Sequence, residues 1–566
     1  MRLVSALRFK NQAAPASPAS GDTAVWTTTD TVPRLKAKDS AGVERYLHYE
    51  FYYNVKDYGA TGNGTTDDAA TIQAAIAAAV TAGGGTVYVP YGTYKINSEL
   101  EITGSNIKIL LNPGATIRRG SSGMQYMLKN FNSSYAPTVY GGRMNITIEG
   151  GVWDADGATI SAACTVIVFA HSAWVTVRDV QIINVPDWHA IEINSTYTAR
   201  ITNCKFFGFR VVTAGREMSE AVQIDLAVNS ASLPGIGAGA YDNTPCFNIL
   251  VEGCSVSSYG VSGLGGFGKL VGSHAAVDTF EHENIRVIGN FLELCNDYGV
   301  AAYNWNNAVI ANNQFNFCNG GVLIEIPTAC TTDLERFVIQ GNTFFWGGTI
   351  NNGTAVKDKL IETRLTGTGV MRSVSICNNQ IKNFVNVRAI YLSTTSDVVC
   401  QGNSIRNGTD AASVGIQVNN SALGVYQGNK IDTVLGTAMI FENASTECVI
   451  SGSILNAAAN GIKIDAVRCV LQGNIMRISS LSKYGIQLTT TADETVVVGN
   501  HLRQTVGSPT QAGIDVDGAM DAIIQNNWIK GWGITEGSTG PINRGGTLNP
   551  NITVNTIGTT NLNAYQ

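Results

Sequence analysis

The sequence contains few charged residues, few prolines and no long apolar run. Of 566 residues only 14% are charged and 13 are proline, and the net charge is −6. A chain with this acidic balance is not expected to bind nucleic acid non-specifically, because phosphate contacts require clustered Lys and Arg. No run approaches the roughly 18 apolar residues of a membrane helix, so no membrane insertion is predicted. The first residues, MRLVSALRFKNQAAPAS, lack the apolar core of a secretory signal.

Cysteine is present but forms no recognisable motif. The eleven cysteines include no C-x-x-C pair, and several stand inside apolar alternating patterns, such as Cys377, Cys400, Cys448 and Cys469. Thiols in such positions act as small buried hydrophobes. Neither a metal site nor a cofactor is therefore expected.

What the sequence does contain is a repeat. Alternating apolar residues are followed by Gly-Asn or Asn-Asn and another apolar residue, as in VIGNF, VIQGNTF and VVCQGNSI. The repeated position is occupied by Asn290, Asn313, Asn342, Asn379, Asn403, Asn429, Ser453, Asn474, Asn500 and Asn527. A second phrase follows each, usually Gly or Ala and then alternating apolar residues, as in GIQV, GIKI and GIDV.

This repeat predicts an all-β fold, a parallel β-helix. Alternation with a period of two indicates short strands with one buried face. Two or three such strands per repeat, recurring many times, are typical of a β-helix, in which equivalent side chains stack about 4.8 Å apart. The Asn column is then expected to form a ladder of hydrogen-bonded amides at a turn.

The N-terminal part contains a glycine cluster ahead of a predicted helix, in NVKDYGATGNGTTDDAATIQAAIAAAV from Asn54 to Val80. Thr66 or Asp67 is expected to cap this helix, whose apolar residues recur at helical spacing. The glycine order differs from G-x-G-x-x-G, which favours a structural turn over a phosphate-binding loop. A helix here would cover the exposed end of the β-helix.

The segment that runs on to GGGTVYVPYGTYKI closely resembles the N-terminal segment of the pectate-lyase-like superfamily of right-handed β-helices. That superfamily includes polygalacturonase-like hydrolases and bacteriophage tailspike depolymerases. The resemblance implies a right-handed parallel β-helix that acts on polysaccharide, and a homotrimer if the chain belongs to a phage tail.

Four regions are expected along the chain. Residues 1–50 form a segment for attachment to the virion, and residues 51–100 contain the capping helix and the first strands. Residues 101–535 form the parallel β-helix, and residues 536–566 form an extended tail. Long gaps between strand patterns around residues 209–219, 229–247 and 258–283 predict loops that carry function.

The candidate catalytic residues lie on two neighbouring strand patterns, AIEIN and AVQID. The alternation places Glu192, Gln223 and Asp225 on one outward, solvent-exposed face. Asp225 is expected diagonally from Glu192, with their Cβ atoms about 8 Å apart. That spacing suits the acid and base of an inverting glycosidase. Glu220 begins the second strand and is a further candidate.

Histidines and aromatic residues extend this patch. His274, in the sequence GSHAA, loosely resembles the Gly-His-Gly element of polygalacturonase-like hydrolases and is assigned a catalytic role, although the Asp-Asp pair of that family is not visible. The remaining candidates are assigned to substrate binding: Gln223, His189, Trp188, Tyr303, Trp305, Asp278 and Glu325. Tyr259 and Trp346 are further aromatic residues near these repeats. Aromatic faces suit sugar rings, but packing in the core or at a subunit interface is an equal alternative.

Three functions remain open on the sequence. The first is a tailspike-type hydrolase of a bacterial surface polysaccharide, located in the virion tail or outside the cell and bound to other tail proteins. The second is a polysaccharide lyase using Lys205, Arg210 or Arg216, although no Asp cluster suited to Ca²⁺ is evident. The third is a non-catalytic glycan-binding tail fibre of the same fold.

Overall fold

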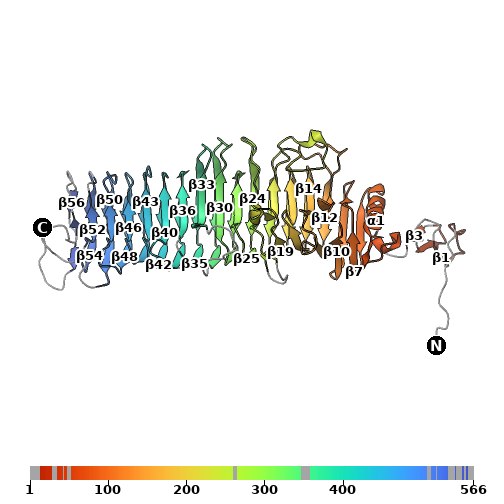
Figure 1. Cartoon of the computed structure of the whole chain (residues 1–566), viewed down its shortest axis with the longest axis horizontal. Helices are drawn as coiled ribbons and strands as arrows, with labels where there is room; N and C mark the ends of the chain where they lie inside the picture. The colour runs from red at the N-terminus through yellow and green to blue at the C-terminus, as the bar shows by residue number, and fades with distance from the viewer. Residues whose placement is uncertain are drawn as a thin grey trace, which may run out of the picture.

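The computed structural model describes residues 13–27, 35–42, 44–46, 52–258, 264–345, 357–385, 387–506, 511–517, 519, 521–532, 542–543, 551–553 and 556–558. These residues form one long solenoid with a small sheet at its N-terminal end (Figure 1). The small sheet is antiparallel and consists of β1 (Thr23–Thr27), β2 (Leu35–Asp39) and β3 (Glu44–Tyr46). Among the described strands, these three pair only with one another.

The solenoid is a parallel β-helix with three sheets, which the chain visits in turn. Sheet 1 contains β4 (Tyr52–Asn54), β6 (Gly85–Val89), β9 (Ile107–Leu111), β12 (Met144–Glu149), β15 (Ala173–Arg178), β18 (Tyr197–Thr202), β21 (Phe247–Glu252), β24 (His282–Ile288), β27 (Trp305–Asn306), β28 (Ala308–Ala311), β31 (Leu334–Gln340), β34 (Met371–Cys377), β37 (Thr395–Ser396), β38 (Val399–Gln401), β41 (Val425–Gln427), β44 (Val449–Ser451), β47 (Val470–Gln472), β50 (Val496–Val498), β53 (Ile523–Gln525) and β56 (Asn551–Thr553).

Sheet 2 follows sheet 1 in each coil. It contains β5 (Asn63–Asp67), β7 (Gly92–Ile96), β10 (Ala115–Arg119), β13 (Val152–Asp154), β16 (Gln181–Pro186), β19 (Lys205–Arg210), β22 (Ser255–Ser257), β25 (Phe291–Glu293), β29 (Gln314–Asn316), β32 (Thr343–Phe345), β35 (Gln380–Phe384), β39 (Ser404–Gly408), β42 (Lys430–Val434), β45 (Ile454–Ala457), β48 (Ile475–Ile478), β51 (His501–Gln504), β54 (Trp528–Lys530) and β57 (Thr556–Gly558).

Sheet 3 closes each coil and carries the candidate site. It contains β8 (Leu100–Glu101), β11 (Tyr126–Lys129), β14 (Thr165–Ala170), β17 (Ile191–Asn194), β20 (Glu220–Asp225), β23 (Lys269–Gly272), β26 (Tyr298–Tyr303), β30 (Gly320–Ile326), β33 (Lys359–Leu365), β36 (Arg388–Ser393), β40 (Val414–Asn419), β43 (Met439–Glu442), β46 (Ile462–Ile464), β49 (Ile486–Leu488), β52 (Ile514–Val516) and β55 (Ile542–Asn543).

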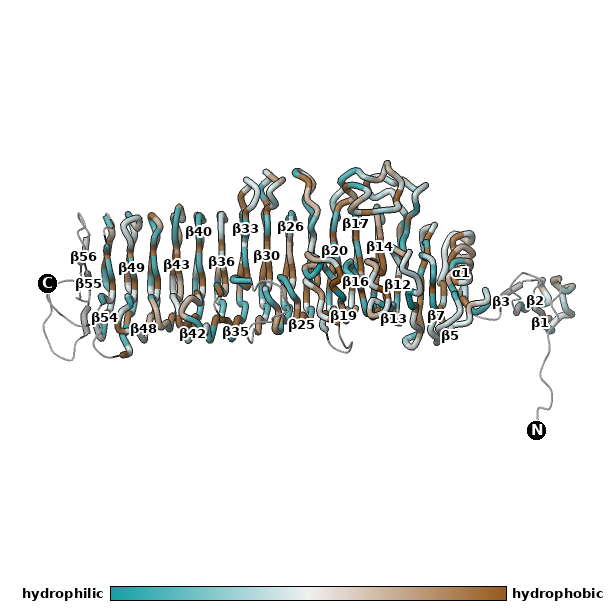
Figure 2. The backbone as a smooth tube through the Cα atoms, in the orientation of Figure 1, coloured by the Kyte–Doolittle hydropathy of each residue, from teal (hydrophilic) through white to brown (hydrophobic). Residues whose placement is uncertain are grey.

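The core lies inside this coil and follows from the alternation in the sequence. In β12 and β15 the residues Ile146, Ile148 and Val177 are buried, whereas the residues between them are at least partly exposed. Figure 2 shows the same alternation of apolar and polar residues along the solenoid. Pairing continues beyond residue 535, because β55, β56 and β57 pair with the preceding strand of each sheet.

The Asn ladder is confirmed. The side chain of Asn403 accepts from the backbone and side-chain nitrogens of Asn379, both at 3.0 Å, and donates to Asn429 at 3.0 Å. Its amide also donates to the carbonyl oxygen of Ile376 at 2.8 Å. The oxygen and the nitrogen of this buried amide therefore both have hydrogen-bond partners, and the ladder links the turns between sheets 1 and 2 along the axis.

Helix α1 (Ala69–Thr81) packs at the N-terminal end of the solenoid (Figure 1) and buries Ile72 and Ile76 there. It begins after Asp68, and the side chain of Asp67, one of the two predicted capping residues, accepts from the backbone nitrogen of Ala69 at 3.1 Å. The Asp68 carboxylate instead accepts from the backbone nitrogens of Thr61 at 2.7 Å and Gly62 at 3.0 Å. The glycine-rich loop thus binds a carboxylate of its own chain, and the structural interpretation of its glycines is confirmed.

One segment stands outside the regular coil over the early strands of sheet 3. Residues 226–246, which include the short 3₁₀-helix η3 (Ala238–Ala240), follow β20 and fold over β11 and β14 (Figure 1). Leu233 and Ile236 of this segment pack in a small cluster with Tyr126 and Val168. Within the part of the chain described here, no helix has the length and apolarity needed to cross a membrane.

Candidate active site

Two adjacent strands of sheet 3, β17 and β20, position the site. They pair in parallel, with Glu192 opposite Gln223 and Asn194 opposite Asp225. The predicted diagonal relation of Glu192 and Asp225 is therefore confirmed. The alternation of inward apolar and outward polar residues is also confirmed, because Ile191, Ile193 and Ile224 lie in the core.

The predicted solvent exposure of this outward face is wrong. Glu192 is only 4% exposed, Gln223 3% and Asp225 1%. The cover comes from the segment after β20, whose residues Ala231, Ser232 and Pro234 line a cavity above Glu192. Strand alternation predicts which face a side chain occupies, but it does not report a loop that folds back over that face.

Among the described residues, no cationic side chain contacts the buried carboxyl group of Glu192. Asn194 donates to its Oε1 at 2.7 Å, and Thr165 donates to its Oε2 at 3.2 Å. Burial raises the pKa of Glu192 to about 7, and the nearby Asp225 carboxylate adds to this effect. A carboxyl with such a pKa holds its proton near neutral pH and is suited to act as a general acid.

Asp225 has more polar partners. Its carboxylate accepts from Gln223 Nε2 at 2.7 Å and from the backbone nitrogens of Leu226 at 3.0 Å and Ala275 at 3.1 Å. Burial raises the pKa of Asp225, whereas His274 and these donors oppose the rise. Asp225 and Glu192 therefore form a pair of carboxyl groups in different environments.

Glu220 lies between cationic groups. Its carboxylate is 3.0 Å from Lys269 Nζ, 3.6 Å from His274 Nδ1 and 3.5 Å from His189 Nδ1. Burial opposes its charge, but Lys269 and His274 hold the pKa of Glu220 well below its usual range. Glycine at position 272 permits this approach, because a Cβ there would lie 3.0 Å from Lys269 and 3.1 Å from Glu220. The cationic neighbours thus favour the ionised form of Glu220.

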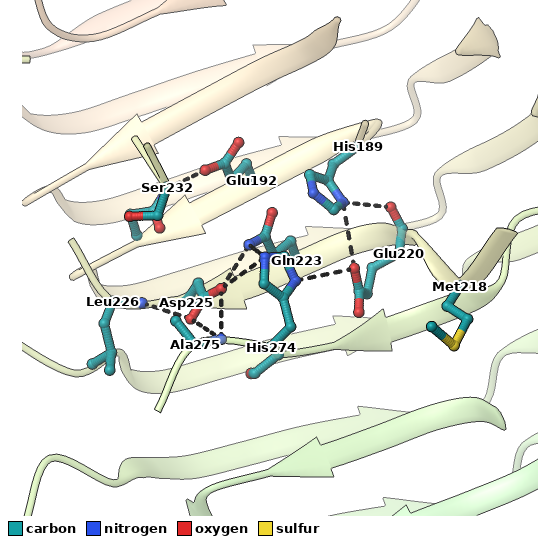
Figure 3. Close-up of polar contacts among 12 residues, drawn as sticks. His189, Glu192, Met218, Glu220, Gln223, Asp225, Leu226, Ser232, His274 and Ala275 are labelled. Carbon is teal, nitrogen blue, oxygen red and sulfur yellow. Dashed lines mark hydrogen bonds and ion pairs between the residues drawn. The ribbon is translucent and has the colours of Figure 1, made fainter. Parts of the chain in front are cut away.

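His274 bridges two carboxylates (Figure 3). Its Nε2 lies 3.7 Å from Asp225 Oδ2, and its Nδ1 faces Glu220. Burial opposes protonation, but these two carboxylates raise the pKa of His274 to about 9. The side chain is 48% exposed, so water screens part of this attraction. His274 is accordingly the positively charged member of the site that solvent can reach.

His189 behaves differently from its neighbour. Its Nδ1 donates to the carbonyl oxygen of Glu220 at 3.1 Å, and its ring stacks on that of His274 with centroids 5.8 Å apart. Burial lowers the pKa of His189 to about 3, so the ring is neutral. It orients the start of β20 and the His274 ring without adding charge.

These side chains border a cavity of about 70 Å³, which Tyr126, Trp188 and Arg216 also line. Ligand pockets typically measure about 300–1,000 Å³, so this volume admits water but not a sugar ring. Sugar binding at Glu192 therefore requires the segment 226–246 to move. Trp188 lines this cavity, and its assignment to substrate binding stays a prediction.

One group of donors in the described residues has metal-ligand spacing. His189, Glu220 and His274 each offer an atom within 4.8 Å of the others. However, the Lys269 ammonium pairs with the same carboxylate, and repulsion from this charge disfavours a cation between the histidines.

Several predicted site residues lie elsewhere. Trp305 is wrong as a sugar-binding residue, because it lies in the core of the solenoid and its indole donates to Ser273 at 2.7 Å. Asp278 accepts from Thr331 and Thr332 in a neighbouring loop. Glu325 is paired with Arg364, at 3.3 Å, farther along sheet 3.

Tyr303 is half-buried and pairs in register with Glu325. Burial and the carboxylate of Glu325 raise its pKa, and Asp225 adds to this effect. Tyr259 and Trp346 lie outside the described residues.

Two residues of the candidate site were not found from the sequence. Lys269, buried in an ion pair with Glu220 and a second with Asp297 at 3.3 Å, was not considered. Thr165 was missed because it precedes the site by a full coil. Lys269 could have been found from its position at the start of an apolar strand pattern, where a charged residue is rare.

A family model described as "Rhamnogalacturonase A/epimerase, pectate lyase-like" matches residues 52–323, the part of the chain that holds the candidate site. Among curated proteins, the chain is 27% identical over 315 residues to plasmin and fibronectin-binding protein A of Streptococcus pneumoniae, covering 51% of this chain and 43% of that protein. It is 63% identical over 46 residues to mannuronan C5-epimerase AlgE4 of Azotobacter vinelandii, which is 8% of each. The chain thus spans less than half the length of these two relatives.

Solved structures support the fold. The adhesin PfbA of Streptococcus pneumoniae superposes with a TM-score of 0.56 at 21% identity, over 68% of this chain and 92% of that one. The tailspike protein of E. coli bacteriophage HK620, solved with a pentasaccharide, gives a TM-score of 0.50 at 12% identity, over 89% and 84%. Identities this low bear on the fold alone. The chain thus folds as a right-handed parallel β-helix, and its residues 52–323 are similar to the pectate-lyase-like family described by that model.

Proposed function

We propose that this chain is a glycoside hydrolase that cleaves a bacterial surface polysaccharide, with Glu192 as general acid and Asp225 as general base. The observation that carries this proposal is the pair of buried carboxyl groups on adjacent rungs, one of which has a pKa of about 7. Glycosidic hydrolysis requires an acid for the leaving oxygen and a base for water.

The geometry suits inversion. A rung step of about 4.8 Å combined with a two-residue step of about 6.7 Å gives a Cβ separation of about 8 Å between the two residues. This separation leaves room for a water molecule beside the sugar, as in inverting glycosidases, whose carboxyl groups lie roughly 6.5–9.5 Å apart. Asp225 would take the proton of that water while Glu192 protonates the leaving oxygen.

Burial raises the pKa of Asp225, and the charged groups beside the pair oppose this rise and so favour its ionised form. His274 attracts the Asp225 carboxylate, and Glu220 keeps His274 protonated. Lys269 in turn keeps Glu220 anionic. His274 and Glu220 are therefore positioning residues for the base, and neither is required to contact the sugar in this proposal.

The two alternatives to a hydrolase are a polysaccharide lyase and a non-catalytic binding protein. A lyase requires a base that is deprotonated before the reaction, and Lys269 is unsuited to this role because the carboxylates around it raise its pKa. A non-catalytic binding protein is favoured by the relative of Streptococcus pneumoniae, which is named for binding plasmin and fibronectin. Burying the carboxyl group of Glu192 without a cationic partner costs stability. Carboxyl groups with such a raised pKa are typical of catalytic sites, which favours an enzyme over a binding protein.

The setting of the enzyme is part of the same proposal. The chain would belong to a phage tail as a homotrimer, with residues 1–50 binding other tail proteins and the solenoid reaching the host polysaccharide. The self-contained β1–β3 sheet and the likeness in fold to a tailspike support this proposal.

The test is digestion of purified capsular and wall polysaccharides from candidate hosts. Wild-type protein is expected to produce new reducing ends without the ultraviolet absorbance of an unsaturated uronate. Asp225→Asn should abolish cleavage with an unchanged circular dichroism spectrum. Asp333→Asn, which alters an exposed carboxylate paired with Arg372, is the matched control and should remain active. Unsaturated products would establish a lyase, and binding without products would establish a non-catalytic protein.

A further inference from the structure

The outer surface of sheet 2 is basic in the C-terminal half of the solenoid, although the chain as a whole has a net charge of −6. We name the outer surface of the rungs from β35 to β54, which lie toward the C-terminal end in Figure 1, the basic face. Its outward positions carry six exposed cations: Lys382, Arg406, Lys430, Arg477, Arg503 and Lys530. At the same described positions the one acid is Asp432, which is half-buried.

These cations are not neutralised by the chain itself. None of the six forms an ion pair with a residue that the structure describes, whereas Arg178, on sheet 1, lies 2.7 Å from Glu149. Arg477, Arg503 and Lys530 pair in register on consecutive rungs, so like charges follow one another at steps of about 4.8 Å. Such charges repel one another, and a bound anion would relieve the repulsion.

Two clefts border the basic face on the side where sheet 2 turns toward sheet 3. The first has a volume of about 480 Å³ and is lined by Asn407 and Leu435. The second has a volume of about 340 Å³ and is lined by Asn456, Arg477 and again Leu435, so the two clefts adjoin. Both volumes lie within the roughly 300–1,000 Å³ of ligand pockets. The cavity at Glu192, in contrast, measures about 70 Å³.

The lining of the first cleft has the chemistry of a sugar site. The Asn407 amide donates to Asn383 Oδ1 at 2.9 Å and accepts from the Thr433 hydroxyl at 2.7 Å, which forms a row of amide and hydroxyl groups. Val385 and Leu435 are 38% and 48% exposed at the wall of this cleft. Amides and hydroxyls can pair with sugar hydroxyls, and apolar side chains pack on the faces of sugar rings.

The position of the cations indicates that the sugar is acidic and part of a chain. Lys382 and Arg406 immediately precede Asn383 and Asn407, and Arg477 lines the second cleft. A carboxylate or sulfate on a sugar in these clefts would therefore have a cation beside it, and guanidinium groups bind such oxyanions well. Six steps of about 4.8 Å give the basic face a length of about 29 Å, which suits a polymer.

Nucleic acid fits this surface less well. Duplex DNA carries one charge per about 1.7 Å of its axis, much denser than one cation per rung. Ile454 and Ile475, each 37% exposed, interrupt the cations at the middle of the basic face. Single strands are bound by rows of stacking aromatic residues, but His501 and Trp528 are the only rings at the described outward positions of this face.

We propose that the basic face and the two clefts beside it form a second binding site, which holds an acidic polysaccharide chain along the solenoid. The candidate active site lies on sheet 3 in earlier coils, so the two sites do not share a residue. The second site would retain the polymer whether or not the chain cleaves it. This inference therefore does not depend on the proposed hydrolysis.

The first experiment measures binding of the full chain to immobilised carboxymethylcellulose by biolayer interferometry, with hydroxyethylcellulose as the neutral polymer and duplex DNA as the other polyanion. All proteins carry Asp225→Asn, so that cleavage cannot consume the polymer. Carboxymethylcellulose should bind at low salt and be released as the ionic strength rises, because exposed charges are screened. Hydroxyethylcellulose should bind at least about tenfold more weakly, and so should DNA. Equal binding of the neutral polymer, tighter binding of DNA, or no binding of carboxymethylcellulose overturns the proposal.

The matched variants locate the site. Arg406→Gln combined with Arg477→Gln and Arg503→Gln should weaken binding at least about tenfold, with an unchanged circular dichroism spectrum and an unchanged mass by light scattering. The control removes three exposed arginines from sheet 1 and so changes the net charge equally: Arg178→Gln, Arg200→Gln and Arg286→Gln. This control should bind as the parent does. Equal weakening in both variants would show an effect of net charge alone, and a changed mass would assign the basic face to a contact between subunits; either result overturns the proposal.

A second experiment tests the clefts. Thr409 and Ser479 are exposed and each lines one cleft, so Thr409→Trp combined with Ser479→Trp fills both without removing a charge. Binding of carboxymethylcellulose should weaken at least about tenfold. Ala444→Trp, at an exposed turn between sheets 3 and 1, is the matched control and should bind normally. Unchanged binding with filled clefts would remove the clefts from the site and overturn the proposal as stated.

Discussion

Glu192 and Glu220 show how the same residue type acquires opposite properties from its surroundings. Glu192 is held by an amide and a hydroxyl, and burial raises its pKa to about 7. Glu220, one rung away and as deeply buried, is paired with Lys269, which keeps the pKa of Glu220 well below its usual range. Neutral hydrogen-bond partners leave the cost of burying charge in place, whereas an ammonium group at 3.0 Å offsets it.

The pKa of Glu192 predicts the pH dependence of cleavage. The general acid must carry its proton, so kcat/KM should fall as the pH rises through about 7. Glu192→Gln should lower kcat by about 10²–10⁴-fold and remove this alkaline limb. The measurement is the pH profile of reducing-end release by wild type and variant.

An alkaline limb that persists in Glu192→Gln would assign it to another group. His274, whose pKa is raised to about 9, would then be the next candidate. Wild-type protein that remains fully active well above pH 7 would contradict the role of Glu192 as acid.

At the scale of elements, the Asn ladder fixes each coil to its neighbours. A ladder amide accepts from two nitrogens of the preceding coil and donates to the following amide and to a carbonyl, as at Asn403. Ser453 interrupts this pattern. Its hydroxyl accepts only from the backbone nitrogen of Asn429, at 3.3 Å. The side-chain amide of Asn429 therefore donates to the carbonyl oxygen of Cys400 but not to the next residue of the ladder.

Restoring the amide predicts a more stable solenoid. Ser453→Asn should add two to three buried hydrogen bonds and raise the free energy of unfolding by about 1–2 kcal/mol. Gly452 has a φ of 58°, close to the 67° of Gly402 before Asn403, so the turn already has the required shape. The urea midpoint and the hydrogen exchange of the Asn429 amide measure the effect.

Ser453→Ala is the matched control and should lower the midpoint, because it leaves the Asn429 nitrogen without its acceptor. A Ser453→Asn variant that is less stable than wild type would mean that the site is too small for the longer side chain.

The strands, the Asn ladder and the terminal helix could all be predicted from the sequence, because each depends on local alternation or on a repeat. The pairing of Glu192 with Gln223 followed from the same alternation. The burial of the site could not be predicted, since it depends on how residues 226–246 fold over sheet 3 and pack Leu233 against Tyr126. Trp305 was assigned to the surface for a related reason: a short strand such as β27 has too few residues for its alternation to be read.

At the scale of the whole molecule, the solenoid separates its tasks along its axis. The candidate site occupies the N-terminal half, whereas the Asn ladder continues through the regular coils of the C-terminal half. In a solenoid each coil contacts mainly its neighbours, so one half can change without altering the other. The ends of the solenoid differ from this pattern, because there a strand has a neighbour on one side only.

The N-terminal end provides the last prediction. Since β1–β3 pair only with one another among the described strands, a chain that starts at residue 52 should keep its β-helix, its oligomeric state and its cleavage activity. A chain that starts at residue 83 also lacks α1, whose Ile72 and Ile76 are buried against the first coils. The same truncation removes β4 and β5, which pair with β6 and β7. Losing the helix and these strands exposes the core and the edges of β6 and β7, so the shorter chain should aggregate. Light scattering and reducing-end release compare the two truncations with the full chain. Aggregation or inactivity of the chain that starts at residue 52 would show that the first 51 residues support the solenoid, and would contradict their proposed role as a separate attachment segment.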